Sequence, residues 1–363
     1  MHSVSVIDED VHIFGGLVSD DTLAGREMHI LKLSNAGSHE TQYRCIPALS
    51  ADDALPAPRA AHSACVADKK IVMFGGYGSA EKKEPIEEHG RVWVFSPQTL
   101  EWSHLDPVDG KFPHCHSHAA VISGNTLIVH GGKSGRMSTS DSSSTWAFDM
   151  SLQSWNELPE IHDAAGATLT SSNSFPNLAI AHEKLYLISA SSNLNGCIHV
   201  LDLALEAPKA WTTLEFPTNP LTPGPRLRKA AGLHPISTGY GRTYLLLIFG
   251  AKTEPGETEV RQDDTPEFWS DIWTLQLPST SVTPAKAKDA TRESIGVDSG
   301  EAKWAEVEIT SHGETKLAEG KSHPGPRAYF GSAPVDGKKV LIWGGLNARG
   351  EPEGDGWTIA LKF

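Results

Sequence analysis

Apolar residues come in short runs of about four or five along this chain, and turn-forming residues close each run. One stretch shows the pattern: the runs Ala64–Val66, Ile71–Phe74 and Val92–Phe95 are separated by Asp, Lys, Gly and Pro. Short runs bounded by such residues predict β-strands rather than helices. No stretch approaches the ~18 consecutive apolar residues of a membrane-spanning helix. The pattern therefore predicts a protein made of many short strands.

A pair of glycines follows one apolar run in each unit, and the motif recurs along the whole chain. The complete copies lie at 15–16, 75–76, 131–132 and 344–345, and the degenerate copies at 189–190 and 250–251. The steps between them are 60, 56, 58, 61 and 94 residues. A period of this size predicts an array of similar units. We expect each glycine pair to end a second strand, where the backbone turns with positive φ and packs tightly.

Two further strands complete each unit. The predicted third strands are Met28–Leu31, Val92–Phe95, Thr145–Phe148, Ile198–Leu201, Ile272–Leu275 and Trp357–Ala360. An aromatic residue marks the fourth strand, at Tyr43, Trp102, Trp155, Trp211 and Trp304. Because tryptophan buries a large area, we expect the tryptophans among them in the core between units.

Units of this size bury too little apolar surface alone, whereas a radial arrangement lets them cover one another. With its Gly-Gly motifs and downstream tryptophans, the chain resembles the kelch-type β-propellers over nearly its whole length. The resemblance implies an all-β, six-bladed propeller with four antiparallel strands per blade, in a single domain over 1–363. The expected blades span 1–50, 51–107, 108–160, 161–217, 218–310 and 311–363.

The two ends and one insertion depart from the regular pattern. The chain starts on a first strand and ends on a third, so the count is 23 strands rather than 24. Either blade six is three-stranded, or an N-terminal strand that would complete it is missing. The segment 278–303 is rich in Ser, Thr, Ala and Lys and lacks an apolar period, so it predicts a flexible surface insertion. A regulatory role for it is the alternative.

Charge and cysteine content narrow the function. The net charge is −14, which argues against duplex nucleic acid and anionic membrane surfaces as partners. The four cysteines have no CxxC spacing, and no signal peptide is recognisable at the start. We therefore expect a soluble protein of a reducing compartment, with a cytoplasmic location.

Successive strands of a blade run in opposite directions. The long loop that follows each glycine pair and the turn that precedes each first strand therefore lie on the same face of the propeller, around the mouth of its channel. Aligning the repeats puts Arg59, Cys115, Asn173, Arg226 and Arg327 at one position of this mouth. The neighbouring position holds His2, His62, His118, Pro176, Lys229 and Phe330. Such a mixed ring favours a binding role for the arginines. The alternative is that each arginine pairs with an acidic loop residue or a carbonyl group.

The string His114-Cys115-His116-Ser117-His118 contains side chains that can bind a metal or transfer a proton. On a strand, the three histidines would share one side and so could bind zinc or iron. We expect no metal, because this string aligns with Pro58–His62 of the preceding repeat. His118 then corresponds to His62, a histidine that is usual at this position of the kelch repeat. A histidine or cysteine acting as acid, base or polar wall is the other interpretation.

Other motifs are absent, including a P-loop, GxGxxG, HExxH and GxSxG. Plant specifier proteins, which share the kelch fold, carry an ExxxDxxxH iron triad. Glu267 and Asp271 match its first two positions, but Leu275 replaces the histidine, so that site is not carried over.

Two functions remain. The first is a cofactor-independent enzyme, similar to the fungal kelch-type hetero-Diels–Alderases of tropolone–terpenoid pathways. This resemblance implies a pericyclase, formally a lyase- or isomerase-like cyclase of secondary metabolism, without a redox cofactor and with an apolar oxygenated small molecule as substrate. Its expected catalytic residues are Arg59, His62, His118 and Arg226. Its expected substrate-binding residues are Tyr77, Cys115, Asn173, Lys229, Trp269, Arg327 and Phe330. The alternative is a kelch scaffold that binds a protein partner.

Overall fold

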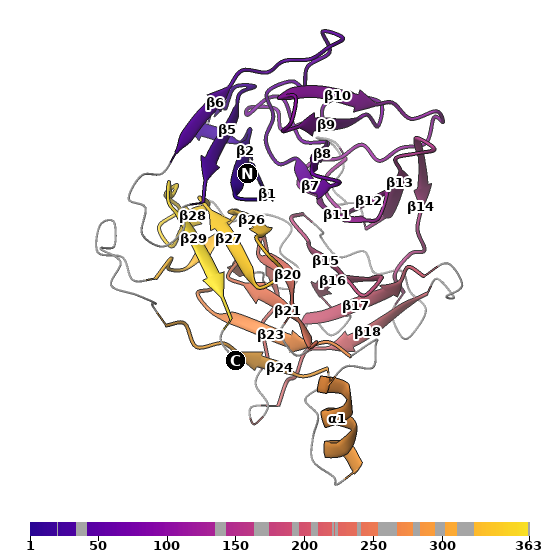
Figure 1. Ribbon diagram of the computed structural model, residues 1–363, viewed down its shortest axis with the longest axis vertical. Helices are drawn as coiled ribbons and strands as arrows, with labels where there is room; N and C mark the ends of the chain where they lie inside the picture. The colour runs from indigo at the N-terminus through magenta and orange to yellow at the C-terminus, as the bar shows by residue number, and fades with distance from the viewer. Residues whose placement is uncertain are drawn as a thin grey trace.

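The computed structural model describes residues 1–19, 21–33, 42–134, 143–162, 174–190, 196–204, 210–219, 221, 224–237, 241–252, 267–278, 284–294, 302–310 and 323–361. Its strands form antiparallel sheets arranged radially around a central channel (Figure 1). The expectation of an all-β propeller of six blades is confirmed.

Blades one to three each contain four strands. Blade one consists of β1 (Ser3–Ile7), β2 (Asp10–Phe14), β5 (Met28–Lys32) and β6 (Tyr43–Ile46). Blade two consists of β7 (Ser63–Ala67), β8 (Lys70–Phe74), β9 (Val92–Ser96) and β10 (Glu101–Leu105). Blade three consists of β11 (Ala119–Ser123), β12 (Thr126–His130), β13 (Thr145–Asp149) and β14 (Ser154–Glu157).

Blades four and five also have four strands, and the described residues of blade six form three. Blade four consists of β15 (Asn177–Ala181), β16 (Lys184–Ala190), β17 (Gly196–Asp202) and β18 (Trp211–Glu215). Blade five consists of β20 (Gly232–Ser237), β21 (Thr243–Ile248), β23 (Ile272–Gln276) and β24 (Trp304–Glu306). Blade six consists of β26 (Gly331–Pro334), β27 (Lys339–Trp343) and β29 (Gly356–Ala360).

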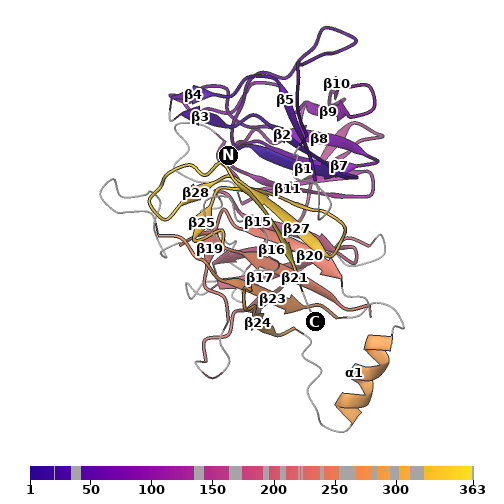
Figure 2. The same ribbon diagram turned by 60° about the vertical axis from the view of Figure 1, so that its left-hand side comes forward.

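Short strand pairs extend the loops that follow the second strands, and Figure 2 shows several of them gathered on one side of the disc. These pairs are β3 (Leu17–Ser19) with β4 (Thr22–Leu23), β19 (Arg228–Lys229) with β22 (Ala251–Lys252), and β25 (Arg327–Ala328) with β28 (Leu346–Asn347). We call this side the loop face. The opposite side, which carries the turns between first and second strands, is the hairpin face.

The core is divided among the contacts between neighbouring blades. One apolar cluster joins blades one and two, where Trp102 packs against Phe14 with ring centroids 5.1 Å apart. The next cluster joins blades two and three, where Trp155 packs against Phe74 at 4.9 Å. Both tryptophans are buried, as predicted. Further clusters continue around the ring and close it between blades six and one.

Backbone hydrogen bonds run from blade to blade around the channel. The amides of Ala61, Ser117, Phe175, Ala230 and Tyr329 each donate to the equivalent residue of the preceding blade, over 2.6–3.2 Å. Blade one takes part through Met1, whose carbonyl accepts from Ala61 and whose nitrogen donates to Tyr329. All five amide donors have φ between 52° and 57°. This left-handed conformation is what turns each amide toward its neighbour.

The glycine pair allows the next blade to approach closely. Gly75 has φ of 64°, and a Cβ there would lie 2.6 Å from the carbonyl oxygen of Cys115 in the next blade. The amide of Gly76 donates to the same carbonyl, as the amide of Gly16 donates to that of Arg59. The predicted reason for the motif is therefore confirmed. In blade five, Phe249 adopts the same left-handed conformation as the first glycine, at φ of 50°.

The long insertion of blade five lies between β23 and β24, as expected, but it contains a helix. Helix α1 (Pro284–Ser294) projects from the rim of the disc (Figures 1 and 2). The carboxylate of Asp289 is paired with Arg242, which lies in the turn between β20 and β21. Residues 284–294 of the insertion are thus helical, and the ion pair with Arg242 joins the helix to blade five. The flexibility expected of the insertion stays a prediction.

Candidate functional site

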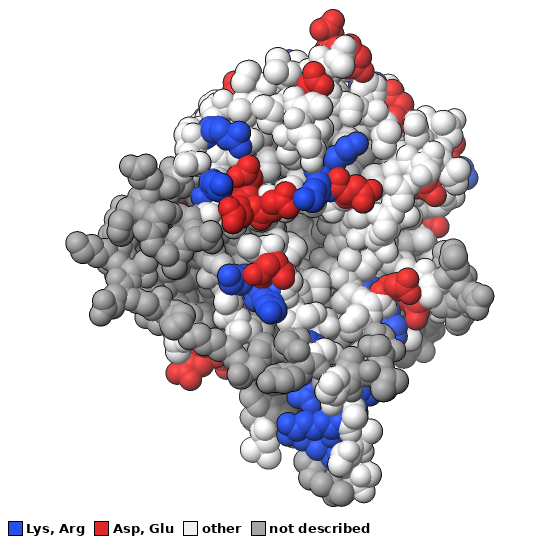
Figure 3. Space-filling model, in the orientation of Figure 1, with Lys and Arg blue, Asp and Glu red and all other residues white. Residues whose placement is uncertain are grey.

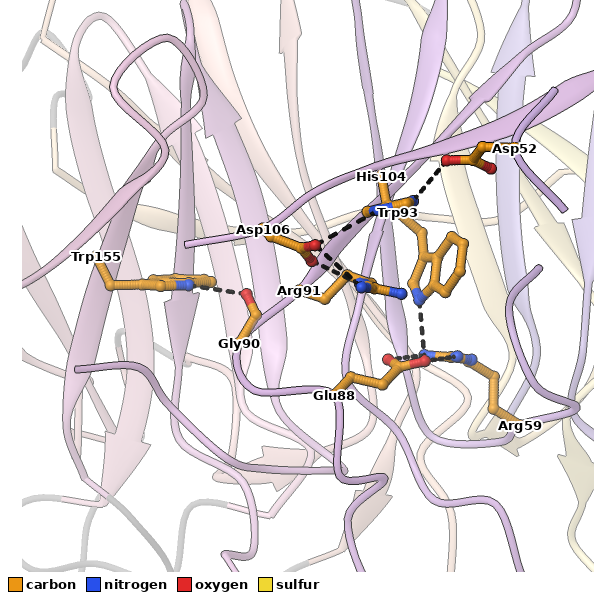
Figure 4. Close-up of polar contacts among 9 residues, drawn as sticks. All are labelled: Asp52, Arg59, Glu88, Gly90, Arg91, Trp93, His104, Asp106 and Trp155. Carbon is orange, nitrogen blue, oxygen red and sulfur yellow. Dashed lines mark hydrogen bonds and ion pairs between the residues drawn. The ribbon is translucent and has the colours of Figure 1, made fainter. Parts of the chain in front are cut away.

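The three blades that carry an arginine at the channel mouth use it in the same way. The Arg59 guanidinium donates to both carboxylate oxygens of Glu88, at 2.8 and 2.5 Å, and to the carbonyl of Gly75 at 3.0 Å. Trp93 on β9 donates to the same carboxylate at 3.0 Å (Figure 4). The Arg59 side chain is fully buried. Its charge is therefore neutralised within the blade.

Blades five and six repeat this arrangement of arginine, carboxylate and tryptophan. Arg228 pairs with Asp271 at 2.6 and 3.1 Å, and Trp273 donates to Asp271 at 2.6 Å. Arg327 pairs with Asp355 at 2.6 Å, and Trp357 donates to Asp355 at 2.9 Å. Hydrogen bonds from Arg228 and Trp273 lower the pKa of Asp271, although burial alone would raise it.

The repeat alignment of blade five is corrected by two residues. Arg228, not Arg226, takes the position of Arg59, and it makes the same contacts to a carboxylate and to the end of the second strand. Ala231, not Lys229, takes the position of His62, because its Cβ approaches Gly250 as that of His62 approaches Gly76. Counting back from the glycine pair could not identify Arg228, because the turn between β20 and β21 is longer than the corresponding turns of blades one to four.

A cavity of about 150 Å³ lies in the channel. It is lined by His2, His62, His118, Phe175, Tyr329 and Phe330, among others. The structure thus brings together the predicted residues His62, His118 and Phe330. It does not bring the arginines, Cys115 or Trp269 to this cavity.

The histidines of the cavity are held by the neighbouring blade. Nε2 of His62 bonds to Ser3 Oγ at 2.9 Å, and Nε2 of His118 bonds to Ser63 Oγ at 2.8 Å. Burial lowers the pKa of His118 to about 3, and burial together with Arg59 holds the pKa of His62 well below 6.5. Both imidazoles are therefore neutral at physiological pH. Their expected catalytic role stays a prediction.

The remaining predicted residues lie at different depths. Tyr77 is buried beside Ala60, and its hydroxyl contacts Met1 Sδ at 3.8 Å. Cys115 is buried in the core between blades two and three. Trp269 is half-buried on the loop face, with cations around its ring. Asn173 lies outside the described residues. The binding roles of these residues stay predictions.

The three histidines of the 114–118 string do not converge. Ser117 has φ of 57°, and β11 begins only at Ala119, so the alternation expected of a strand is broken. His114 faces Glu87 at 3.0 Å, and His116 stands edge-on to Tyr77. Within the described part of the chain, no group of three His, Cys, Asp or Glu side chains could hold a metal ion.

A second polar cluster lies on the outer part of blade two. Arg91 donates to both carboxylate oxygens of Asp106, at 2.6 and 3.0 Å. His104 lies between Asp106 and Asp52, at 3.5 and 3.6 Å (Figure 4). The pKa of Asp106 is lowered, chiefly by its hydrogen bond from Arg91. This cluster joins the outer strand of the blade to the preceding linker.

Sequence reasoning missed a Cys–His pair in blade four. Cys197 Sγ lies 3.3 Å from Nε2 of His199, which also contacts Ser189 Oγ at 2.7 Å. Burial raises the pKa of Cys197 to about 11 and lowers that of His199 to about 4. At neutral pH the thiol is protonated and the imidazole is neutral. The pair is therefore not an activated nucleophile.

The state of the thiols is directly testable. We expect a thiol reagent to modify one cysteine quickly in the native protein, Cys45, because only this one is exposed. Cys115 and Cys197 should react only after unfolding, since they are buried and their pKa values are raised to about 12 and about 11. Mass spectrometry after timed labelling, with and without denaturant, measures this. Fast native labelling of Cys115 would instead favour its predicted place in an open pocket.

The sequence matches the KLHDC2/KLHL20/DRC7 Kelch-repeats domain over residues 1–235. The chain belongs to the kelch-repeat family. A solved structure, that of YjhT, shares the fold with a TM-score of 0.63 at 16% identity, covering 99% of this chain and 94% of its own. Among the described residues of this kelch propeller, no helix has the length and apolarity needed to cross a membrane.

Curated relatives contain kelch segments within longer chains. The Arabidopsis thaliana acyl-CoA-binding domain-containing protein 4 is 29% identical over 208 residues, which are 56% of this chain and 29% of that protein. The Drosophila melanogaster leucine-zipper-like transcriptional regulator 1 homolog is 23% identical over 74% of this chain and 25% of its own. The mouse Rab9 effector protein with kelch motifs is 33% identical over 22% of this chain and 20% of its own. The kelch propeller thus spans less than a third of these relatives.

Proposed function

We propose that this kelch propeller is a protein-interaction module that binds an acidic segment of its partner on the loop face. The observation that carries the proposal is a cationic surface around Trp269. Lys252 Nζ lies 4.9 Å from the centre of the Trp269 ring, and the guanidinium carbons of Arg228 and Arg226 lie at 5.3 and 6.0 Å. We call Arg226, Lys252 and Trp269 the cationic rim.

The charges of the rim differ in their availability. Arg228 is buried and paired with Asp271, so it belongs to the blade. Arg226 is exposed, and Lys252 is partly exposed with an ion pair to the exposed Glu267. Surface pairs of this kind contribute little stability, so an incoming carboxylate can replace Glu267 at small cost. Arginine and tryptophan are also the residues most enriched at the energetic centre of interfaces.

On the hairpin face, two exposed lysines are paired locally, Lys69 with Asp8 at 3.0 Å and Lys339 with Asp336 at 3.6 Å. Figure 3 shows basic and acidic side chains side by side on one face of the disc, with basic side chains gathered over α1. Because the chain carries a net charge of −14, local positive charge on the loop face would select and orient an acidic partner.

Family membership supports the same role. Two of the relatives are named as an effector and as a transcriptional regulator, and both names agree with binding to other proteins. We carry over only this general role.

The pericyclase predicted from the sequence is the competing function. A pocket for a drug-sized ligand usually encloses at least ~300 Å³. The channel cavity encloses about 150 Å³, and the buried arginines are bound within their blades. These observations favour the scaffold, and the enzymatic reaction stays an untested hypothesis.

Peptide selection tests the proposed function. A random peptide library selected on the intact protein should yield sequences rich in Asp and Glu. We expect their affinity to fall about tenfold or more in the double variant Arg226→Glu/Lys252→Glu, measured by fluorescence polarisation. The matched control is Lys69→Glu/Lys184→Glu, which reverses one exposed and one partly exposed lysine on the hairpin face and should leave affinity unchanged.

Two results would overturn the proposal. One is a set of peptides without acidic residues, or with equal affinity for both double variants. The other is specific thermal stabilisation by tropolones or phenols that is lost in His118→Gln, which would favour the pocket enzyme.

A further inference from the structure

The outermost strand of blade six differs from those of the other blades. In blades one to five, the third strand is paired on both sides, with the second strand and with the fourth. In blade six, β29 is paired with β27, and no described residue is paired along its other edge. A strand edge of this kind exposes unpaired amide and carbonyl groups, which another strand can bind.

Among the described residues, no strand covers one apolar position of β29. Elsewhere the fourth-strand tryptophan lies opposite an apolar residue of the third strand, in the pairs Phe95–Trp102, Phe148–Trp155, Leu201–Trp211 and Leu275–Trp304. These four apolar residues are at most 2% exposed. Ile359 takes this position in β29, two residues after the carboxylate-bound Trp357, as Leu275 follows Trp273. Ile359 and Trp357 are only half-buried.

The edge of β29 also lacks protection. Natural edge strands usually carry charges, proline or a bulge that prevent further pairing. The outer strands of the other blades follow this rule, with the charged residues Arg44, Glu101, Glu157, Glu215 and Glu306. The sequence of β29 is Gly-Trp-Thr-Ile-Ala, with neither a charge nor a proline.

We propose that β29 is a docking site for an extended segment of a partner protein, which adds to blade six as an antiparallel fourth strand. The segment carries an aromatic side chain that lies opposite Ile359, followed by alternating polar residues. The chain's own fourth strands define this chemistry, because each places Trp or Tyr at that position. Main-chain hydrogen bonds then supply affinity, and the aromatic side chain supplies register.

The aromatic side chain would enter an existing apolar contact. Trp102 of blade two reaches Phe14 at the end of the second strand of blade one. The corresponding residue of blade five is Ile248, which belongs to the cluster that joins blades five and six, with Ile359 packed against it. The bound segment therefore extends this core. The site is separate from the cationic rim and does not depend on the proposed function.

A peptide of known register tests this site. The probe is residues 100–106 of the chain, Leu-Glu-Trp-Ser-His-Leu-Asp, with blocked ends and a fluorescent label. We expect it to bind the intact protein by fluorescence polarisation, and to protect amides of β29 from hydrogen exchange. Replacing its Trp by Ala should weaken binding about tenfold or more, and replacing its Ser by Pro should abolish binding.

Changes in the protein complete the test. Ile359→Lys adds a charge at the half-buried edge and should also weaken binding about tenfold or more. The matched control is Thr212→Lys, on the exposed outer strand of blade four, and it should leave binding of the peptide unchanged. If Ile359→Lys fails to fold, the two altered peptides still decide the question. Equal binding of all three peptides, or none at roughly millimolar peptide, overturns the proposal. A concentration-dependent dimer that Ile359→Lys abolishes also overturns it, because the occupant is then a second copy.

Discussion

Replacing Arg59 by Met should lower the free energy of unfolding by about 3–5 kcal/mol, because it leaves the Glu88 carboxylate largely buried without its cation. The loss should be similar for Arg228→Met, since Arg228 makes the same contacts to Asp271. Urea unfolding followed by tryptophan fluorescence measures both effects.

Arg226→Met is the matched control for this experiment. It removes the same side chain from the same turn, but Arg226 is exposed and only stacks on Trp269 at 6.0 Å, so stability should change by less than about 0.5 kcal/mol. Adding Glu88→Gln to Arg59→Met removes the unpaired charge while keeping an acceptor for Trp93, and should restore part of the loss. If Arg59→Met were as stable as the control, Arg59 would be available for a ligand, as the sequence first suggested.

The blades could be predicted from sequence because their signals are local. The glycine pairs indicate a positive φ and a close approach between blades, and both are found at Gly75. The ring of backbone hydrogen bonds around the channel has no such signal. Its donors include Ala61, Ser117 and Tyr329, which share a conformation but no side-chain chemistry. Likewise, the ion pair of Arg242 with Asp289 joins a helix to a turn that is distant in sequence. No local sequence pattern predicts such a contact.

Two of the three buried arginines, Arg59 and Arg327, were recognised from the sequence, but Arg226 was chosen in place of Arg228 and no carboxylate partner was identified. Two of the three carboxylates lie two residues before a tryptophan, in Asp271-Ile-Trp273 and Asp355-Gly-Trp357. This Asp-x-Trp pattern would have indicated a buried pair in blades five and six, and one arginine for each. In blade two the carboxylate is Glu88, five residues before Trp93, so the spacing alone could not reveal it. Longer side chains and loop turns allow the same contact from a different distance in sequence.

Acidification should unfold this protein well before its carboxylates titrate. Burial lowers the pKa of His2, His118 and His130 to about 3, and that of His199 and His234 to about 4. In the unfolded chain these groups have pKa values near 6.5. Below that value the unfolded state binds protons that the folded state excludes, so stability falls from about pH 6.5 down to the folded-state values.

The expected loss is large because five buried histidines contribute to it. At about pH 5, each of these histidines costs roughly 2 kcal/mol, so five together cost on the order of 10 kcal/mol, comparable to the whole stability of a typical domain. Circular dichroism during a pH titration should therefore show cooperative unfolding between about pH 5 and 6. His118→Gln keeps a partner for Ser63 but cannot titrate, and should shift the midpoint to lower pH. His89→Asn, at an exposed loop position, should not shift it. A fold that persists at about pH 4 would show that water reaches these imidazoles and that the blades are less tightly closed than their contacts indicate.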